Sequence, residues 1–274
     1  MVNLSLLEDM PLLIRNDMIA LFLGTSEGKK ILSLLNRFTK DIYISTATAY
    51  GGELLKNYKY EVLNTKPLDK LALAVVFKEN NIKLVVDVTH PYATEITNTL
   101  MDLCTEYSLK YIRYERSSVI DKFKGSSGIV KIQSYEELLE AMGNIHGTIL
   151  NTTGSRNIKK LMDLGLENRI VHRVLPSIEV MREYFSLGLK VENIIAIKGP
   201  TSYELNCSFI KQYEAKAIIL KDSGVQGGTE EKLMAAIDLG ITAFVIGRSH
   251  INYENAFCNE EKLVEYIKKT YRRM

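Results

Sequence analysis

The sequence has few cysteines and no long apolar run. Its three cysteines, Cys104, Cys207 and Cys258, are spaced neither as a disulfide framework nor as a metal site. No apolar stretch approaches the roughly 18 residues that a membrane-spanning helix needs, so we expect no membrane span. The first 17 residues lack a secretory-signal layout, and the sparse cysteines fit a reducing compartment. We therefore expect a cytoplasmic protein.

An excess of charge of either sign is also missing. The chain carries 35 Lys and Arg against 33 Asp and Glu, a net charge of +2, which does not favour a nucleic-acid or membrane-surface binder. The four histidines, His90, His146, His172 and His250, share no metal-ligand spacing, so we predict no metal site.

The sequence instead contains short apolar runs that alternate with amphipathic stretches. Strands are predicted at residues 18–23, 41–46, 60–64, 84–88, 111–114, 130–132, 148–151, 170–175, 194–197, 217–220 and 242–246. Strands that alternate with helices predict an α/β protein with mainly parallel sheets. A polar loop at 115–128 separates two halves, which predicts an N-terminal extension (1–17) and two Rossmann-like domains (18–128 and 129–274).

Polar residues with glycine or proline follow six of these strands. The carboxyl ends of parallel strands share one edge of a sheet, where open α/β sheets bind ligands. Two such domains predict a ligand cleft between them.

The fourth predicted strand carries the densest group of candidates at its end. These are Asp87, Thr89, His90 and Tyr92. Proline is favoured at the first helical position, so a helix beginning at Pro91 would place His90 near its cap. The helix N-terminus would favour a neutral imidazole. We predict that these residues orient the substrate; the alternative for His90 is a histidine that only holds the loop.

A glycine turn follows the first strand, where a dinucleotide fold places its phosphate turn. The candidate cofactor residues there are Gly24, Thr25, Ser26 and Glu27. The second strand ends with Thr46 and Thr48 and without the acid that usually bonds the ribose of NAD, which favours NADPH. The alternatives are a capped helix start and an ordinary polar strand end.

Similar turns follow later strands. The further cofactor candidates are Gly199, Thr201, Ser202, Gly227, Gly228 and Thr229. Four basic residues at strand ends, Arg156, Lys198, Lys221 and Arg248, would suit a substrate with several carboxylates, and Ser223 is a further candidate for binding. Capped turns and solvated basic side chains are the alternatives.

Four motifs in this order resemble the precorrin-6A reductase family of cobalamin biosynthesis. They are G-T-S-E-G, D-V-T-H-P-Y-A, K-G-P-T-S-Y-E-L-N and K-D-S-G-V-Q-G-G-T-E-E-K. The resemblance covers about residues 18–271. It departs from the family at Leu23, where the family usually has glycine, and at Ser249, where it often has proline.

The resemblance implies an oxidoreductase that uses NADPH to reduce one double bond of precorrin-6A, or of its cobalt form, to precorrin-6B. It also implies two Rossmann-like domains with the cofactor in the cleft and a tetrapyrrole substrate rich in carboxylates. Hydride transfer to a conjugated ring needs mainly positioning, and solvent can supply the proton, so no obligatory catalytic residue is assigned. The expected partner is this small molecule, bound by a monomer or homodimer.

Two other functions remain open from the sequence. One is an NADPH-dependent reductase of a different carboxylated substrate, and the other is a non-catalytic binder of nucleotides or tetrapyrroles. The Lys-, Ile- and Asn-rich composition indicates an AT-rich genome and an anaerobic organism, in which cobalt is inserted early. This favours the cobalt-containing substrate.

Overall fold

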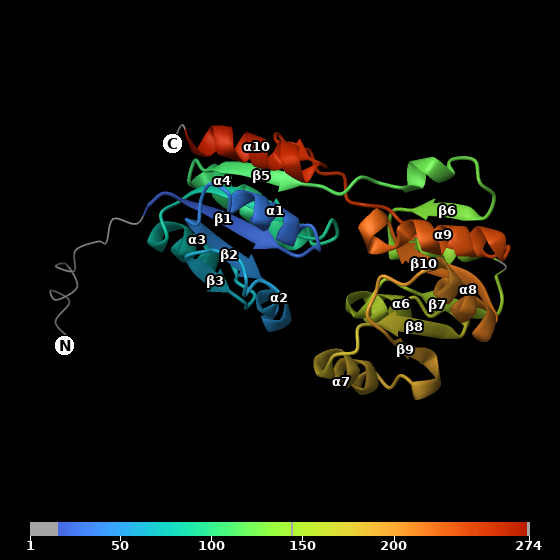
Figure 1. Ribbon diagram of the computed structural model, residues 1–274. Coiled ribbons are helices and arrows are strands. Elements are labelled where there is room, and N and C mark those ends of the chain that lie inside the picture. Colours follow the sequence, from blue (N-terminus) through green and yellow to red (C-terminus); the bar gives the residue numbers. More distant parts are fainter. Residues whose placement is uncertain (1–15, 144, 273–274) are drawn as a thin grey trace, which may run out of the picture. The chain divides into compact units, whose positions relative to one another are not determined.

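The computed structural model describes residues 16–143 and 145–272, which build two six-stranded sheets (Figure 1). The strand orders are β12-β5-β4-β1-β2-β3 and β6-β11-β10-β7-β8-β9, and every strand pair is parallel. The predicted α/β class with two Rossmann-like sheets is confirmed. Residues 1–15 of the predicted N-terminal extension lie outside the described residues.

The first unit contains the described chain up to Glu115 and the segment that begins at Asn252. Its strands are β1 (Met18–Leu23), β2 (Ile42–Thr46), β3 (Val62–Asn64), β4 (Ile82–Val88), β5 (Lys110–Tyr114) and β12 (Ala256–Phe257). Its helices are α1 (Gly28–Leu35), α2 (Ala49–Glu53), α3 (Lys70–Glu79), α4 (Thr94–Glu106) and α10 (Glu260–Tyr271).

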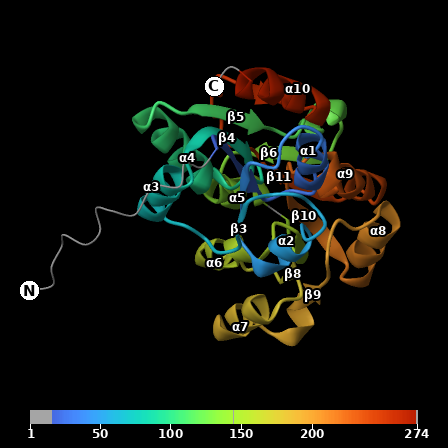
Figure 2. The ribbon, with the colours of Figure 1, turned by 60° about the vertical axis from the view of Figure 1, so that its left-hand side comes forward.

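Strand β1 shows why this sheet is covered on both faces. Successive side chains of a strand point to opposite faces, and all six residues of β1 are buried. Ile19 and Leu21 pack with the buried residues of α1 and α10, whereas Ala20 and Phe22 pack with those of α3 and α4. Figure 2 shows α10 and α1 together on one side of the sheet.

The second unit spans Arg116–Ile251. Its strands are β6 (Ile129–Ile132), β7 (Thr148–Asn151), β8 (Ile170–Val174), β9 (Ile194–Ala196), β10 (Ala215–Lys221) and β11 (Thr242–Ile246). Its helices are α5 (Tyr135–Met142), α6 (Ile158–Asp163), α7 (Ile178–Ser186), α8 (Tyr203–Gln212) and α9 (Thr229–Asp238). One core cluster joins β10 and β11 to α8 and α9, through residues such as Ile218, Val245, Ile210 and Leu233.

The two sheets share one topology, with an exchange at the sixth position. Strands β1 to β5 and β7 to β11 follow the same order, third-second-first-fourth-fifth, which is the Rossmann arrangement. The sixth position of the first sheet is filled by β12, which follows the whole second unit. The sixth position of the second sheet is filled by β6, which follows β5 of the first unit.

This exchange changes the predicted domain boundary. The sequence predicted domains of 18–128 and 129–274, but the chain crosses between the units after Glu115 and again after Ile251. The short helical turn Ile120–Phe123 packs into the second unit's core, and α10 packs into that of the first. Apolar side chains on α10, such as Leu263 and Ile267, are buried there, so the last segment belongs to the first unit. No helix of the described chain is long and apolar enough to cross a membrane.

Candidate functional site

Each sheet has a topological switch point, where the strand order reverses. It lies between β1 and β4 in the first sheet and between β7 and β10 in the second. Ligands of open α/β sheets bind outside the carboxyl ends of the strands at this point. The candidate residues therefore belong to two such edges, and each edge is described by itself.

In the first unit, the loops after β1 and β4 are bonded to each other. The backbone N–H of Gly24 donates to the carbonyl of Val88 at 3.2 Å, and the Thr25 hydroxyl donates to the same oxygen. A Cβ on Gly24 would lie 3.1 Å from the backbone nitrogen of His90, so a glycine allows this close approach. The second unit repeats the bond, because the Thr152 hydroxyl donates to the carbonyl of Ile219 on β10.

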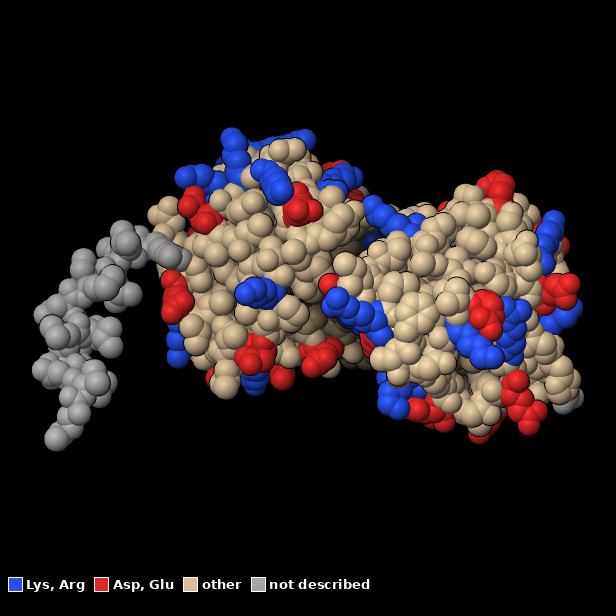
Figure 3. Space-filling model, turned by 90° about the horizontal axis from the view of Figure 1, so that it is seen from below, with Lys and Arg blue, Asp and Glu red and all other residues tan. Residues whose placement is uncertain are grey.

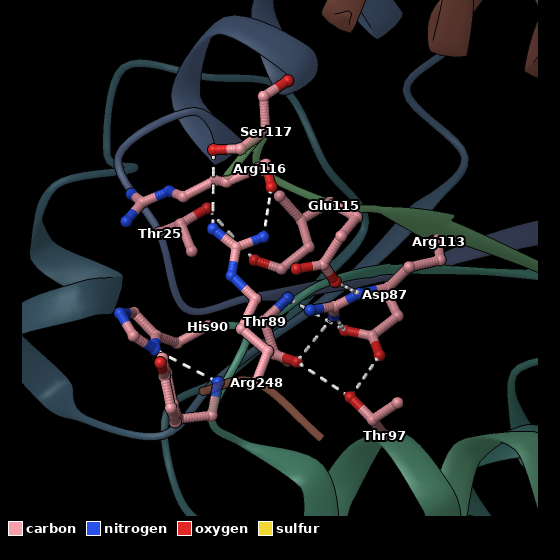
Figure 4. A network of polar contacts seen from close by, with 12 residues as sticks. Thr25, Asp87, Thr89, His90, Thr97, Arg113, Glu115, Arg116, Ser117 and Arg248 are labelled. Atoms are coloured by element: carbon pink, nitrogen blue, oxygen red, sulfur yellow. Dashed lines mark hydrogen bonds and ion pairs between the residues drawn. The ribbon is translucent and has the colours of Figure 1, made fainter. Parts of the chain in front are cut away.

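Asp87 lies at the centre of a buried polar network at the end of β4 (Figure 4). Its carboxylate is fully buried and accepts hydrogen bonds from the Thr89 backbone, the Thr97 hydroxyl and the Tyr111 hydroxyl. Arg113 lies 2.7 Å from it and also donates to the Thr89 hydroxyl. Because these contacts surround the carboxylate, Asp87 can hold the loop but does not present its oxygens to a ligand.

This network perturbs the ionisation of its members. Burial raises the pKa of the Tyr111 hydroxyl strongly, and the neighbouring Asp87 carboxylate raises it further. Burial alone would lower the pKa of Arg113, but the charges of Asp87 and Glu115 outweigh it and raise that pKa. Arg113 therefore stays charged.

His90 and Tyr92 remain accessible beyond this network. Both are partly exposed, their rings lie 5.7 Å apart, and His90 Nδ1 accepts a hydrogen bond from the Tyr92 backbone at 3.3 Å. The predicted helix start at Pro91 is wrong, because α4 begins at Thr94 after a turn closed by the Ala93 N–H and the His90 carbonyl. His90 therefore does not cap the helix.

The predicted phosphate turn of the first unit holds a buried carboxyl group. Glu27 is only 5% exposed and occupies the N-cap position of α1, and its carboxyl accepts from the Ser26 hydroxyl. A helix N-terminus favours an anion, but here the chain's own carboxyl group already lies there. This arrangement is unfavourable for a pyrophosphate at the Gly24 turn.

The end of β2 presents little accessible side chain. Thr46 is 5% exposed and its hydroxyl donates to the carbonyls of Thr48 and Asn64. Thr48 is exposed and caps α2 by accepting from the Gly51 backbone. As the sequence shows, no acidic side chain follows this strand before α2.

In the second unit, two candidate hydroxyls are buried within their own loops. Thr229 is fully buried; its hydroxyl donates to the Lys221 carbonyl and accepts from the Ser223 backbone. Thr201 is 5% exposed and is bonded to Arg173 and Asn206, whereas Ser202 caps α8. Thr229 and Thr201 therefore shape the loops. Gly199 is exposed and Gly227 partly exposed, whereas Gly228 is buried.

Two buried cations, Arg173 and Lys232, lie behind these loops, and the charge of Glu231 acts on Lys232. Arg173 of β8 donates to Thr201 and Asn206, and Lys232 of α9, 6% exposed, donates to the Gly227 carbonyl at 3.0 Å. Among the described residues, neither forms an ion pair with an acid. Burial lowers the pKa of Lys232 to about 7 and that of Arg173 to about 10. The N-cap of α9, Gly228, provides no side-chain cap and packs against Pro200 of the neighbouring loop.

Further basic residues follow β7 and β10 on the same edge. Burial, together with the charges of Arg156 and Lys160, lowers the pKa of Lys221 to about 8. Lys198 is exposed beside Gly199. This edge of the second unit is thus positive, whereas the face seen in Figure 3 shows basic and acidic side chains intermingled on each unit.

Arg248, predicted to bind substrate, is engaged within its own unit. Its Nε donates to the Asp222 carbonyl and lies 3.3 Å from Asp222 Oδ2. Its Nη1 and Nη2 donate to the carbonyls of Arg116 and Ser117 (Figure 4). These contacts occupy the guanidinium and make a direct role in ligand binding unfavourable.

Four polar residues in these networks were not predicted from the sequence to be site residues. They are Arg113, Arg173, Asn206 and Lys232. The two arginines lie inside apolar strands, K-Y-I-R-Y and I-V-H-R-V, and a charged residue inside a buried strand was the signal available. No group of three or more His, Cys, Asp or Glu side chains in the described chain could hold a metal ion.

The fold and its two polar edges define a two-unit Rossmann-like α/β protein with a basic second edge. A family model described as precorrin-6x reductase CbiJ/CobK matches residues 18–268, and the chain belongs to this family of oxidoreductases. The predicted family membership is confirmed. Enzymes of this class act with a nicotinamide cofactor on a tetrapyrrole.

Similar proteins support the assignment over most of the chain. A cobalt-precorrin-6A reductase of Methanocaldococcus jannaschii is 34% identical over 240 residues, 88% of this chain and 92% of that protein. One of Priestia megaterium is 31% identical over 254 residues, 91% and 98% of the two chains. The solved structure of a CobK precorrin-6A reductase has a TM-score of 0.73 at 15% identity and covers 93% of this chain and 97% of that one, which shows the shared fold.

Proposed function

We propose that this protein reduces one carbon–carbon double bond of cobalt-precorrin-6A, with NADPH as the hydride donor, to form cobalt-precorrin-6B in cobalamin biosynthesis. Relatives that cover nearly their full length and carry the name cobalt-precorrin-6A reductase support the substrate. The metal-free macrocycle is the second candidate, because a more distant relative over 62% of this chain is named precorrin-6A reductase.

The observation that carries the ligand site is the pair of buried cations in the second unit, Arg173 and Lys232, with the one nearby carboxylate of Glu231 acting on Lys232. Buried charges are normally paired, and an unpaired cation beside a helix N-terminus favours an anionic ligand. Arg173 and Lys232 lie behind the Gly199 and Gly227–Gly228 turns, beside the start of α9, which has no side-chain cap. These residues fit the phosphates of a nicotinamide dinucleotide.

The first unit fits the phosphates less well, because the buried Glu27 occupies the N-cap of α1, the helix that follows β1. Gly24, Thr25, Ser26, Thr46 and Thr48 remain predicted cofactor contacts, but the electrostatics favour the second unit. His90 and Tyr92 extend beyond the Asp87 network, and we propose that they orient the macrocycle. The cleft between the two units stays a prediction.

When bound, NADPH supplies a hydride to one carbon of the reduced double bond, and a proton must reach the other carbon. The protein's own contribution is to bind and orient, because the reacting atoms need close approach and alignment. Lys221, partly buried and near Arg156, and Lys198 provide positive charge for the carboxylates of the macrocycle. Ser223 is 9% exposed and holds its loop rather than the ligand. Water can supply the proton, so no side chain is assigned as the acid.

The reaction is tested with purified protein, NADPH and cobalt-precorrin-6A, by following the absorbance of the reduced nicotinamide. We expect oxidation of NADPH together with formation of a product that carries two additional hydrogens. Metal-free precorrin-6A and NADH are the comparison substrates. Binding of NADPH without its oxidation, in the presence of authentic substrate, would leave a non-catalytic binder and end the reductase proposal.

The phosphate site is tested with Arg173→Gln and Lys232→Gln. A hydrogen bond to a charged group contributes about 1.5–3 kcal/mol, so each variant should raise the KM for NADPH by roughly tenfold to a hundredfold. Lys159→Gln is the control, because Lys159 is an exposed partner of Asp163 on α6. A raised KM for the macrocycle with an unchanged KM for NADPH would instead assign the two cations to substrate carboxylates.

The cytoplasmic location stays a proposal that rests on the sparse cysteines, and the monomeric or dimeric state stays a prediction. Fractionation of cells and sedimentation of the purified protein test them.

A further inference from the structure

The two units contain an Asp–Arg pair at the same place in their topology. Asp87 lies on β4 and Arg113 on the adjacent β5, where the two residues are register partners. Asp222 follows β10 and Arg248 follows the adjacent β11. Strands β4 and β10 occupy the fourth position of their sheets, and β5 and β11 the fifth. The two pairs therefore belong to equivalent strands, Asp87 and Arg113 within them and Asp222 and Arg248 just beyond their ends.

In each unit the chain leaves for the other unit soon after the fifth strand. It crosses after Glu115, which follows β5, and after Ile251, which follows β11. Each pair consequently lies beside both the strand that departs and the segment that arrives from the other unit.

The arginine of the first unit holds the arriving segment there. The Arg113 guanidinium lies over the ring of Tyr253, 5.7 Å from its centroid, and the Arg113 backbone N–H donates to the Asn255 carbonyl. Tyr253 also stacks on Tyr111, which bonds Asp87. The same guanidinium donates to Thr89, directly before His90. One side chain thus joins the arriving segment to the loop after β4.

The arginine of the second unit, Arg248, also joins the arriving segment to the loop after the fourth strand, but through bonds to backbone carbonyls. Arg248 donates to the carbonyls of Arg116 and Ser117, the first residues of the arriving segment, and to the Asp222 carbonyl in the loop after β10. Arg116 in turn donates to the Ser223 carbonyl at 3.1 Å. A Cβ on Gly224, whose φ is +74°, would lie 3.1 Å from the Ser117 carbonyl oxygen, so the loop packs directly on the arriving segment.

We propose that Arg113 and Arg248, each with its aspartate, are positioning residues that fix the loop after the fourth strand of their unit onto the crossover segment arriving there. The loops they fix, residues 88–92 and 221–224, carry the ligand candidates His90, Tyr92 and Lys221. The sheet alone does not determine the conformation of these loops, because both extend past the last strand pairing. The kinetic part of this proposal rests on the proposed reductase function, but its structural part does not.

The first experiment measures amide hydrogen exchange in the absence of ligand, in the wild-type chain, Arg248→Gln, Arg248→Lys and the control Arg169→Gln. Arg169 is matched to Arg248, because it also donates to a side chain and a backbone carbonyl, but at the amino end of β8. Arg248→Gln should accelerate exchange at residues 116–118 and 221–224 by roughly tenfold or more, the equivalent of about 1.4 kcal/mol, and leave the first unit unchanged. Lysine can pair with Asp222 but cannot span both carbonyls, so Arg248→Lys should give only partial rescue.

The second experiment measures steady-state kinetics of the same variants. A positioning role raises a KM at unchanged global stability, whereas a merely structural role lowers the fraction of folded enzyme and leaves KM unchanged. Arg113→Gln provides the parallel test at residues 88–92 and 253–256. If that variant does not fold, the more exposed Arg248 still tests the proposal.

The outcomes are separable. Local acceleration of exchange with a raised KM supports the proposal. Unchanged exchange at 116–118 and 221–224, or a uniform loss of protection with unchanged KM, overturns it. Local acceleration in a protein that shows no reductase activity with any substrate would support the loop anchoring and contradict the proposed function alone.

Discussion

Arg113 Nη1 lies 2.7 Å from Asp87 Oδ1, and both side chains are at most 1% exposed. A buried charge is tolerated only when it is paired and hydrogen-bonded, and here each partner satisfies the other and several neighbours. The pair therefore explains why an aspartate that follows three buried apolar residues, Leu84 to Val86, is compatible with a folded sheet.

Asp87→Asn should destabilise the protein strongly. Removing one partner of a buried ion pair costs about 3–5 kcal/mol, and here Arg113 would keep only the partly exposed Glu115 as a charged partner. Urea unfolding measures the change. Asp163→Asn is the control, because Asp163 forms an exposed i,i+4 pair with Lys159 and should change the free energy of unfolding by less than about 0.5 kcal/mol. A loss of similar size in both variants would contradict the role of burial.

Lys232 should make stability depend on pH. Its pKa is about 7 in the folded state against 10.5 as the ordinary value, so the unfolded chain holds the additional proton between these limits. The free energy of unfolding should therefore rise with pH from about 7 to about 10.5, by at most about 1.4 kcal/mol per pH unit. Urea unfolding at several pH values should show this rise in the wild type and a smaller one in Lys232→Met. Equal slopes in the two proteins would show that folding does not lower the pKa of Lys232.

Thr48→Asp tests which unit holds the 2′-phosphate of NADPH. Aspartate caps a helix as well as threonine does, so α2 should remain intact while a negative charge is added at the end of β2. With the phosphates on the second unit, the KM for NADPH should match that of the neutral control Thr48→Asn. A KM for NADPH that rises while that for NADH does not would place the 2′-phosphate at β2, as the sequence predicted.

Gly227→Ala should disrupt the turn that precedes α9. A Cβ there would lie 2.2 Å from the Cβ of Ser223, so the loop must move, at a typical overpacking cost of about 1–3 kcal/mol. Thermal unfolding measures the loss. The double variant Ser223→Gly, Gly227→Ala removes the clashing atom and should recover part of it. If the double variant is no more stable than the single one, the clash is not the cause.

The sequence predicted the strands well because their apolar runs are short and bounded by turn residues. The 84–88 prediction corresponds to Ile82–Val88, and the 242–246 prediction matches β11. It was wrong about the helix after Pro91, because proline is equally compatible with the turn that closes at Ala93 before α4 begins.

The candidate site was only partly predictable. The glycine turns and polar strand ends lie on the expected edges, but Asp87, Thr201 and Thr229 proved to be buried and bonded within their loops. A polar residue after a strand has the same sequence context whether it contacts a ligand or bonds to its own loop, so the sequence could not distinguish the two roles. Arg173 lies inside strand β8, and Lys232 lies at the end of the first turn of helix α9. Neither was predicted, because the spacing of residues in the sequence does not show which residues contact these two side chains.

The sequence by itself determined the alternation of strands and helices, the parallel sheets and the family, because these depend on local apolar patterns and contiguous motifs. The tertiary structure alone decided that β6 and β12 exchange sheets, that α10 returns to the first unit, and that Asp87 pairs with Arg113. Those features join residues far apart in the chain. They depend on which apolar faces and charges can be satisfied together in three dimensions, and local patterns do not carry that information.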